Sequence, residues 1–302
     1  MEDYSQLLRE VIEPYIMETH FVKLLNDLKA ISTFETIERG GASITVPVRT
    51  SVSSNAAAYD KTDVDPVAGT FVATDATWTK VYQHTAAEVH GIDLSQAKNG
   101  GNPSVTSLIQ DAIAMEFAEL EDLIFDAILT QWKLDIDSSS TYSDAALNRT
   151  TYPTLASQED STTVPLTVAL ARSHSNACRL NKLCGPKSGF QWVMATAVEE
   201  GFTPRAAALH GWNLNDTRRG AEVDLGYQAA NSFEGQLIYS PTGMTAGDVF
   251  YGRKQDFKIR QHRPFAIEQV PSGRDSAKFV MRTGINGYVI NPGFCGKQTN
   301  KS

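Results

Sequence analysis

The residues from Ser104 to Trp132 constrain the fold most strongly, because they predict one unusually long α-helix. Apolar residues recur every three or four positions, which places them on one helical face, and no glycine or proline interrupts them. This face consists of Val105, Ile109, Ala112, Ile113, Phe117, Leu120, Ile124 and Ile128. Asn102 and Pro103 precede the stretch, and they suit the N-cap and the first helical position. At about 1.5 Å per residue the helix would be roughly 43 Å long, so we expect it to act as a beam.

The polar face of this helix is strongly acidic. It has no lysine or arginine before Lys133, and its acidic residues are Asp111, Glu116, Glu119, Glu121, Asp122 and Asp126. Charges of opposite sign usually alternate at i and i+4 on a self-supporting exposed helix. Two interpretations are therefore open: the acidic face is solvated, or it meets basic groups from elsewhere. The apolar face is expected to bury against strands near the end of the chain.

Length and charge limit the classes of protein that fit. A chain of 302 residues can form two core-bearing units or one elongated unit. The hydrophobic content of 41% and charged content of 21% are typical of a folded protein. The net charge of −8 argues against a protein that grips nucleic acid by neutralising phosphates, which requires clustered lysine and arginine.

Cysteine usage and the amino terminus bear on the compartment. The cysteines Cys178, Cys184 and Cys295 are too few and odd in number for a disulfide framework, so we expect a reducing compartment. The first residues, MEDYSQLL, are acidic where a secretory signal is basic, and no run of eighteen apolar residues occurs. The sequence therefore predicts neither export by such a signal nor a membrane-spanning segment.

The first forty residues predict a helical arm. Leucine, valine and isoleucine recur at helical spacing on both sides of Pro14, and this proline is expected to kink or break the helix. A single amphipathic helix of this length is marginally stable alone. We therefore expect the arm to pack against another part of the protein.

The segment from Gly40 to Gly91 predicts a long two-stranded ribbon. It contains no leucine or methionine, and Ile44 is its only isoleucine, so it cannot build a core of its own. Alternating residues over 43–49 and β-favouring residues over 78–89 predict the two strands, and 53–75 reads as an irregular tip. An isolated ribbon is marginally stable, so we expect this one to lie across a neighbouring surface, such as another copy of the same chain.

The remaining sequence predicts an α+β fold. A polar stretch over 135–163 indicates a loop with room for a short strand, and helices are expected from Pro165 to Leu180 and from Gln191 to Glu200. From Gln236 onward, strand-like segments separated by turn signals predict an antiparallel sheet. Asn286–Gly287 is the expected position of a tight turn.

Motifs that carry chemistry are lacking. The sequence has no nucleophile elbow, dinucleotide-binding glycine motif, zinc-protease motif or calcium-binding loop. Its six histidines show no ligand spacing with one another or with the cysteines. Asp60, Asp63 and Asp65 could approach a cation, but they lack the glycine and the distal glutamate of a calcium loop, so a solvated or partner-facing tip is favoured. We predict no enzyme activity, no catalytic residue, no cofactor and no metal.

The order of these parts resembles the major capsid proteins of tailed double-stranded DNA viruses, which have the Hong Kong 97-like fold. The most telling stretches are ATWTKVYQHTAAEVHGIDLSQAK, which leads into the long helix, and GDVFYGRKQDFKIRQHRPFAIEQV followed by KFVMRTGINGYVINPGFCG. The resemblance covers almost the whole chain and lies in the order and length of the parts.

The resemblance implies a division of the chain into the parts known in that family. These are the N-arm (1–39), the E-loop, an extended β-hairpin (40–91), the spine-helix region of the P-domain (92–149), the A-domain (150–245), the P-domain strands (246–282) and the return to the A-domain with the C-terminus (283–302). Many members carry an N-terminal scaffolding segment that is removed during maturation. Because the arm begins at Met1 here, we expect any scaffolding to be a separate protein.

The resemblance also implies a function. Such a protein self-assembles as hexamers and pentamers into an icosahedral shell that encloses viral double-stranded DNA. The expected partners are copies of the chain, portal and scaffolding proteins, and packaged DNA bound without sequence specificity, with no membrane. The expected location is the virion capsid, assembled in the host cytoplasm.

Two alternatives and one set of residues complete these expectations. The alternatives are an encapsulin-like nanocompartment shell protein, which shares the fold but encloses an enzyme cargo, and an unrelated intracellular α+β enzyme. The coreless ribbon counts against the enzyme. A charged and aromatic ribbon without its own core should contact a partner, so the expected inter-subunit residues are Tyr59, Asp60, Lys61, Asp63 and Trp78.

Overall fold

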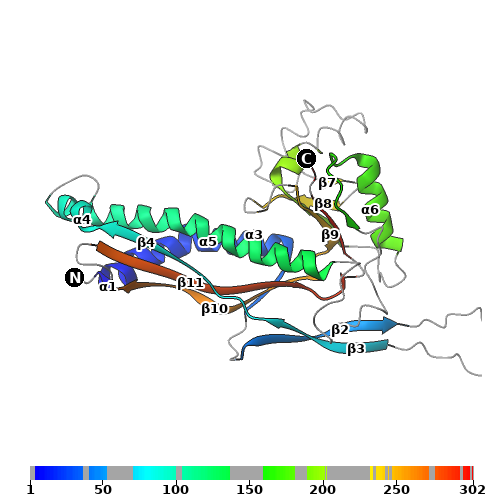
Figure 1. The fold of residues 1–302 in the computed structure, drawn as a ribbon, viewed down its shortest axis with the longest axis horizontal. Coiled ribbons are helices and arrows are strands. Elements are labelled where there is room, and N and C mark those ends of the chain that lie inside the picture. The colour runs from blue at the N-terminus through cyan, green and yellow to red at the C-terminus, as the bar shows by residue number, and fades with distance from the viewer. Residues whose placement is uncertain are drawn as a thin grey trace, which may run out of the picture. The chain divides into compact units, whose positions relative to one another are not determined.

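The computed structural model divides the chain into two compact units, each built from three segments of sequence. Unit 1 consists of Met1–Gly40, Lys80–Leu129 and Ile259–Gly287, and unit 2 of Gly41–Thr79, Thr130–Lys258 and Tyr288–Ser302. The structure describes residues 4–36, 41–52, 71–99, 104–136, 159–180, 189–200, 202, 232–233, 236–241, 244, 247–271, 276–292, 295–299 and 301. Helices and strands occur in both units, as expected for an α+β fold (Figure 1).

A nearly continuous run of helical turns opens unit 1. Its elements are α1 (Ser5–Leu7), the π-helical turn η1 (Leu8–Ile12), α2 (Glu13–Ile16), the π-helical turn η2 (Met17–Phe21) and α3 (Val22–Ile31). The sequence predicts a kink or a break at Pro14, and no break occurs, because helical turns continue through it with π-helical turns on both sides of α2. Pro14 lies in the first turn of α2, where its missing N–H costs no α-helical hydrogen bond.

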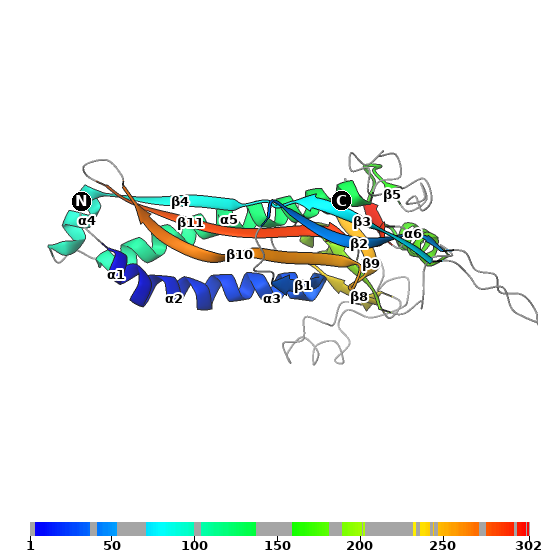
Figure 2. The same cartoon turned by 90° about the horizontal axis from the view of Figure 1, so that it is seen from below.

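The helical arm packs on a four-stranded sheet within unit 1. The strands are β1 (Thr33–Thr36), β4 (Gln83–His90), β10 (Phe257–Val270) and β11 (Ser276–Val289), in the order β1-β10-β11-β4. β4 and β11 are antiparallel, with a register that runs from Ser276 opposite His90 to Thr283 opposite Gln83. The short helix α4 (Gly91–Lys98) follows β4. Figure 2 shows the arm running along β10.

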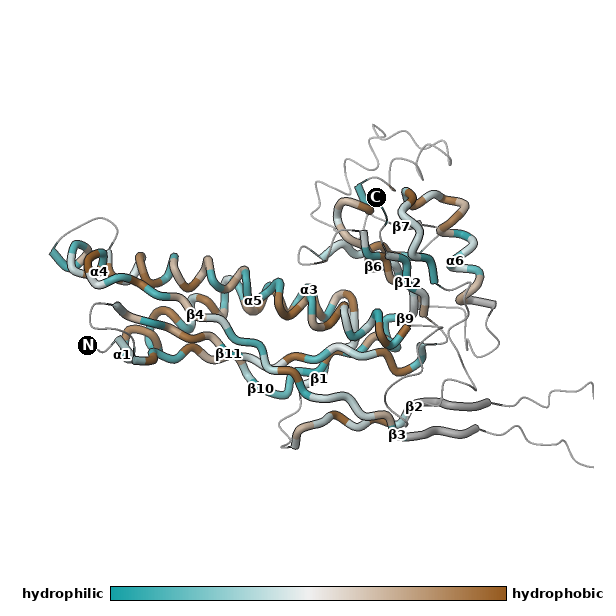
Figure 3. Tube along the Cα trace, in the orientation of Figure 1, coloured by the Kyte–Doolittle hydropathy of each residue, from teal (hydrophilic) through white to brown (hydrophobic). Residues whose placement is uncertain are grey.

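The long helix is present as α5 (Val105–Asp135), three residues longer at its C-terminal end than predicted. Ser104 caps its start, because its Oγ accepts a hydrogen bond from the Ser107 N–H at 3.3 Å; Asn102 and Pro103 lie outside the described residues. The predicted apolar face is confirmed, and Figure 3 shows hydrophobic and hydrophilic residues alternating along the helix. Its fully buried side chains are Ile109, Ile113, Phe117, Leu120, Ile124, Phe125, Ile128, Leu129 and Trp132.

Aromatic packing and one glycine bring α5 against the sheet of unit 1. Phe117 of α5 lies 5.7 Å from Phe265 of β10 and 6.4 Å from Phe21 of the arm, measured between ring centroids. Further along, a Cβ placed on Gly287 of β11 would lie 2.6 Å from the Ile128 Cγ2. β10 and β11 therefore cover the apolar face of α5, as expected. Burying each large side chain contributes about 1.5–3 kcal/mol to stability.

Unit 2 contains the ribbon and a second sheet. The ribbon pairs β2 (Ser43–Val52) with β3 (Phe71–Thr79). The second sheet has the order β5-β12-β9-β6-β8-β7. Its strands are β5 (Glu159–Asp160), β6 (Phe190–Met194), β7 (Ser232–Phe233), β8 (Gln236–Tyr239), β9 (Val249–Arg253) and β12 (Gly296–Gln298), and helix α6 (Val168–Leu180) accompanies it.

The strand predicted over 78–89 and the helix predicted from Gln191 differ from the structure. The predicted strand over 78–89 is two strands, because β3 ends at Thr79 and β4 begins at Gln83; they pair with different partners, β2 and β11. The segment expected to be helical from Gln191 begins as strand β6, and only 196–200 are helical. All residues of β6 are buried, and a short continuous apolar run does not distinguish a buried strand from a buried helix.

The predicted turn at Asn286–Gly287 is also wrong, because β11 continues through both residues to Val289. Gly287 is explained instead by the close approach of Ile128. Asn286 uses its side-chain Oδ1 to accept a hydrogen bond from the Val81 N–H at 2.9 Å. The sequence thus predicts a chain reversal at two residues that instead allow close packing (Gly287) and form a hydrogen bond (Asn286).

Candidate functional site: the ribbon and its root

The ribbon has one apolar and one polar face where it begins. Its register places Ile44 opposite Trp78 and Val46 opposite Ala76, so these side chains share one face. The other face carries Thr45 and Thr77, whose hydroxyl groups are 3.2 Å apart and exposed. The strands continue to Val52 and Phe71, with an irregularity between Arg49 and Ser51.

The apolar face of the ribbon is buried against the end of β11, and we call this cluster the ribbon root. Its members are Ile44, Val46, Ala76, Trp78, Tyr288 and Ile290. The rings of Trp78 and Tyr288 lie 4.5 Å apart, tilted by 30°. The ribbon thus draws its local core from another part of the same chain, because its own sequence lacks the large aliphatic residues needed to form one.

A buried carboxylate anchors the ribbon root. Asp135, at the end of α5, is 1% exposed. Its Oδ2 accepts a hydrogen bond from the Val289 N–H at 2.6 Å, and its Oδ1 accepts bonds from the Gln131 Nε2 at 2.8 Å and from the Trp78 Nε1 at 3.4 Å. Three donors on one carboxylate fix the end of α5, the end of β11 and strand β3 to one another.

The residues that follow β11 are fixed by a second buried carboxylate. Asp256, in the turn between β9 and β10, pairs with Arg253 at 2.5 Å and accepts a hydrogen bond from the Asn291 Nδ2 at 2.6 Å. Its backbone carbonyl also accepts a bond from the Ile290 N–H at 3.1 Å. Burial raises the pKa of Asp256, and Arg253 and Asn291 oppose this rise. This network fixes Ile290 and Asn291, which follow the residue Tyr288 that packs against Trp78.

The last turn of α5 is attached to the second sheet by a lysine. The Lys133 Nζ lies 2.5 Å from the Asp248 Oδ2. The backbone carbonyl of Lys133 accepts a hydrogen bond from the Lys297 Nζ at 2.8 Å. The end of the helix that carries Asp135 is therefore held from two further directions within unit 2.

The acidic face of α5 has local partners in unit 1. Glu116 accepts a hydrogen bond from the Thr85 Oγ1 at 2.8 Å. Burial raises the pKa of Glu121, Lys23 of the arm acts to lower it, and Asp27 and Asp122 add to the rise. Burial likewise raises the pKa of Asp27, and Lys23 opposes it. The basic group that meets this part of the face is a lysine of the arm, while Asp111, Glu119, Asp122 and Asp126 are exposed.

The predicted inter-subunit residues fall into two groups. Tyr59, Asp60, Lys61 and Asp63 lie outside the described residues. Trp78 lies in the ribbon root and is 4% exposed, so any contact that it makes with a partner is small in area, and its interface role stays a prediction. Sequence reasoning missed Asp135 and Tyr288, because an aspartate that opens a polar stretch reads as a loop residue and a tyrosine in a strand reads as ordinary core.

Two further findings concern metal and membrane binding. Within the described ranges, no three histidine, cysteine, aspartate or glutamate side chains are grouped so as to hold a metal ion. None of the helices in the described part of the chain is long and apolar enough to span a membrane.

Comparison with known proteins identifies the fold. No family model and no curated protein matches the sequence. Among solved structures, a chain from Mycobacterium phage Bobi matches with 17% identity and a TM-score of 0.53, covering 90% of this chain and 89% of that chain. The asymmetric unit of the bacteriophage PhiM1 mature capsid matches with 10% identity and a TM-score of 0.55, covering 89% and 85%.

A third structure covers the chain almost from end to end. The satellite phage P4 procapsid, which includes the size determination (Sid) protein, matches with 10% identity and a TM-score of 0.50, over 99% of this chain and 98% of that one. Identities this low establish the fold and not the residues of a site. The helical arm, ribbon, long helix and two sheets together have the Hong Kong 97-like fold of phage capsid proteins.

Proposed function

We propose that this chain is a major capsid protein that self-assembles as hexamers and pentamers into an icosahedral shell around viral double-stranded DNA. The observation that carries the proposal is the likeness to capsid chains over about nine tenths of both chains. In this proposal the work of the protein is assembly, and its sites are interfaces.

The ribbon supports this proposal physically. Its root is buried by its own chain, but β2 continues from Val48 to Val52 beyond the last root residues, a length of about 17 Å at 3.4 Å per residue. A two-stranded ribbon gains little stability alone. A neighbouring copy would supply the missing surface, with contacts from the tip that carries Tyr59, Asp60, Lys61 and Asp63.

The charge of the chain fits the enclosed molecule. With a net charge of −8, the wall of the shell should not hold DNA tightly, so the packaged DNA is enclosed without sequence-specific binding. Portal and scaffolding proteins are the proposed further partners, and the virion capsid, assembled in the host cytoplasm, is the proposed location. The proposed parts are the N-arm, E-loop, P-domain and A-domain with the boundaries given above, except that β4 joins the P-domain sheet.

Expression of the full chain tests the proposal. Size-exclusion chromatography and negative-stain microscopy should show capsomer rings or closed particles, and a monodisperse monomer of 33.0 kDa would overturn the proposal. Particles that enclose a protein cargo instead of nucleic acid would favour the encapsulin-like alternative.

A ribbon variant tests the surface itself. Replacing residues 53–70 by Asn-Gly joins β2 and β3 through a tight turn and leaves the ribbon root intact. We expect a folded subunit with the thermal stability of the native chain and a loss of particles. The matched control is Lys254→Met in the β9–β10 turn, an exposed residue far in sequence from the ribbon, which should assemble normally. Native assembly of the shortened ribbon would contradict the role given to the tip.

A further inference from the structure

The last strand of the chain is an inner strand of the second sheet. β12 (Gly296–Gln298) lies between β5 and β9, parallel to the first and antiparallel to the second. β5 consists of Glu159 and Asp160 alone and stands at the edge of the sheet next to β12. β12 is therefore the strand that holds β5 in the sheet.

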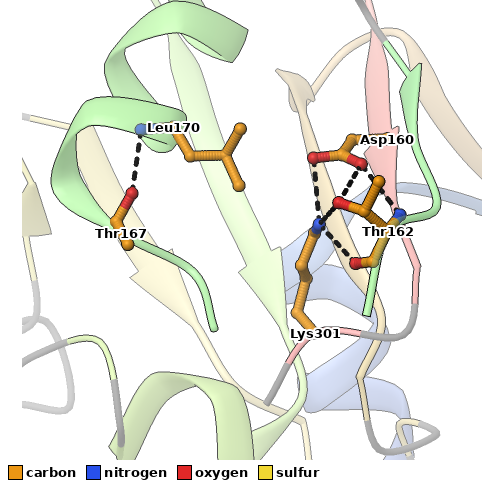
Figure 4. Close-up of polar contacts among 5 residues, drawn as sticks. All are labelled: Asp160, Thr162, Thr167, Leu170 and Lys301. Carbon is orange, nitrogen blue, oxygen red and sulfur yellow. Dashed lines mark hydrogen bonds and ion pairs between the residues drawn. The ribbon is translucent and has the colours of Figure 1, made fainter. Parts of the chain in front are cut away.

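A buried lysine closes this connection. The side chain of Lys301 is 0% exposed. Its Nζ donates to the Asp160 Oδ2 at 2.9 Å, to the Thr162 backbone carbonyl at 2.8 Å and to the Thr162 Oγ1 at 3.2 Å, as Figure 4 shows. An ammonium group has three hydrogens to donate, and these three acceptors match that number.

Hydrogen bonds from Thr162 hold the Asp160 carboxylate in position for this contact. Its Oδ1 accepts hydrogen bonds from the Thr162 N–H at 2.9 Å and from the Thr162 Oγ1 at 2.7 Å. Burial acts to raise the pKa of Asp160, but the bonds from Thr162 and Lys301 outweigh it, so the pKa is lower than usual. The backbone continues the attachment, because the Thr299 N–H donates to the Asp160 carbonyl at 2.8 Å and the Lys301 N–H to the Gly247 carbonyl at 2.9 Å.

Helix α6 covers the first residue of β12. The side chains of His174 and Cys178, both on α6, lie directly against Gly296. A Cβ on Gly296 would lie 2.8 Å from the Cys178 Sγ and 2.8 Å from the His174 Cε1, closer than such atoms approach in proteins. Only glycine lets the strand pass beneath these two side chains, so β12 is fixed at its start by α6 and beyond its end by Lys301.

We propose that residues 296–299 and 301 form a strap, locked by Lys301, that opens as one unit together with residues 159–162 while the four-stranded sheet of unit 1 stays folded. β12 has three residues, whereas β10 and β11 have fourteen residues each. Short paired segments open with lower free energies than long core strands.

Hydrogen exchange measured by mass spectrometry on the full chain tests the strap. Lys301→Met keeps the apolar stem and removes the three donors. We expect the amides of 159–162, 296–299 and 301 to exchange at least about tenfold faster than in the native chain, since hydrogen bonds to charged groups are lost, and those of β10 and β11 to be unchanged. Lys254→Met is the matched control and should alter neither segment.

Unchanged exchange in 159–162, or equal acceleration in β10 and β11, overturns the strap, because Lys301 would then be an incidental contact or a general core residue. If the Lys301 variant yields no folded protein, Thr162→Val decides, since Thr162 is exposed and the substitution keeps the Lys301 contacts with Asp160 and with the backbone carbonyl of residue 162. Faster exchange of both segments in that variant supports the strap, and native exchange overturns it.

Discussion

The indole Nε1 of Trp78 and the carboxylate of Asp135 are 3.4 Å apart, although 57 positions separate the two residues in the sequence. The same carboxylate accepts the shorter bond from the Val289 N–H at 2.6 Å. The contact thus joins the ribbon to the end of the long helix through a group that also fixes the last residues of β11. The root of the ribbon is a small polar and aromatic assembly, not a hydrophobic patch alone.

Substitution of the root carboxylate should cost more stability than loss of the indole donor. Asp135→Asn leaves one acceptor oxygen for three donors, so we expect the free energy of unfolding to fall by about 1–3 kcal/mol. Trp78→Phe removes only the longest of the three bonds and keeps the stacking on Tyr288, so its cost should be smaller. Urea denaturation of both variants measures the difference, and an equal or larger loss for Trp78→Phe would contradict the role given to Asp135.

Acid should weaken unit 2 through His174. Burial is the main cause that lowers its pKa to about 4 from the ordinary value of 6.5, with Asp160 opposing and Lys301 adding to the shift. In the unfolded chain His174 therefore binds a proton near pH 6.5, whereas in the folded chain it binds this proton only near pH 4. The contribution to stability is fully present above pH 6.5 and is lost as the pH falls toward 4, by about 3 kcal/mol in total.

Comparison with His174→Asn isolates this contribution from the other titrating groups. Thermal unfolding of the native chain and the variant between pH 7.5 and pH 4 should give a shallower decrease for the variant. Parallel curves would show that His174 does not titrate as inferred.

Gly287→Ala should destabilise unit 1 because of the close approach of α5. The added methyl group would lie 2.6 Å from the Ile128 Cγ2, and overpacking of this kind costs about 1–3 kcal/mol. Ile128→Ala in the same chain removes that atom, so the two losses should sum to more than the loss in the double variant. Strict additivity in urea denaturation would contradict this packing.

Arg253→Met should leave the Asp256 carboxylate buried without its main partner. We expect the free energy of unfolding to fall by about 3–5 kcal/mol at pH 7, the usual cost of breaking a buried pair. Because burial already raises the pKa of Asp256, removal of Arg253 should raise it further. A carboxyl group whose pKa is raised on folding lowers the free energy of unfolding as the pH rises through that pKa. The stability lost in Arg253→Met relative to the native chain should therefore become smaller as the pH falls from 7 toward 4.

The double variant Arg253→Met with Asp256→Asn provides the control for that prediction. It removes both charges and should recover part of the lost stability at pH 7. A deficit of Arg253→Met that is independent of pH, measured by urea denaturation at several pH values, would sink the assignment of its cause to Asp256.

Sequence reasoning recovered the features that repeat locally. The apolar face of α5, the helical arm and the alternating start of β2 each follow from periodicities of 3.6 or 2 residues, which any stretch displays on its own. The order and length of these parts were also sufficient to indicate the capsid fold. Ile44, Trp78 and Tyr288 all fall in predicted strands, but the contact between Trp78 and Tyr288 was not predicted, because no local pattern indicates a contact across 210 positions.

The features that sequence reasoning missed or misplaced are decided by contacts between distant segments. Asn286 and Gly287 predict a tight turn, yet both lie inside a continuous strand. There Gly287 allows the close approach of Ile128, and Asn286 accepts a hydrogen bond from Val81. Asp135 reads as a loop residue and no sequence pattern marks Lys301, yet each is a centre of hydrogen bonds with residues distant in sequence. Sequence alone determined which faces must be buried, since that depends on spacing, and tertiary structure decided what buries them, since desolvation and hydrogen bonding depend on neighbours in space.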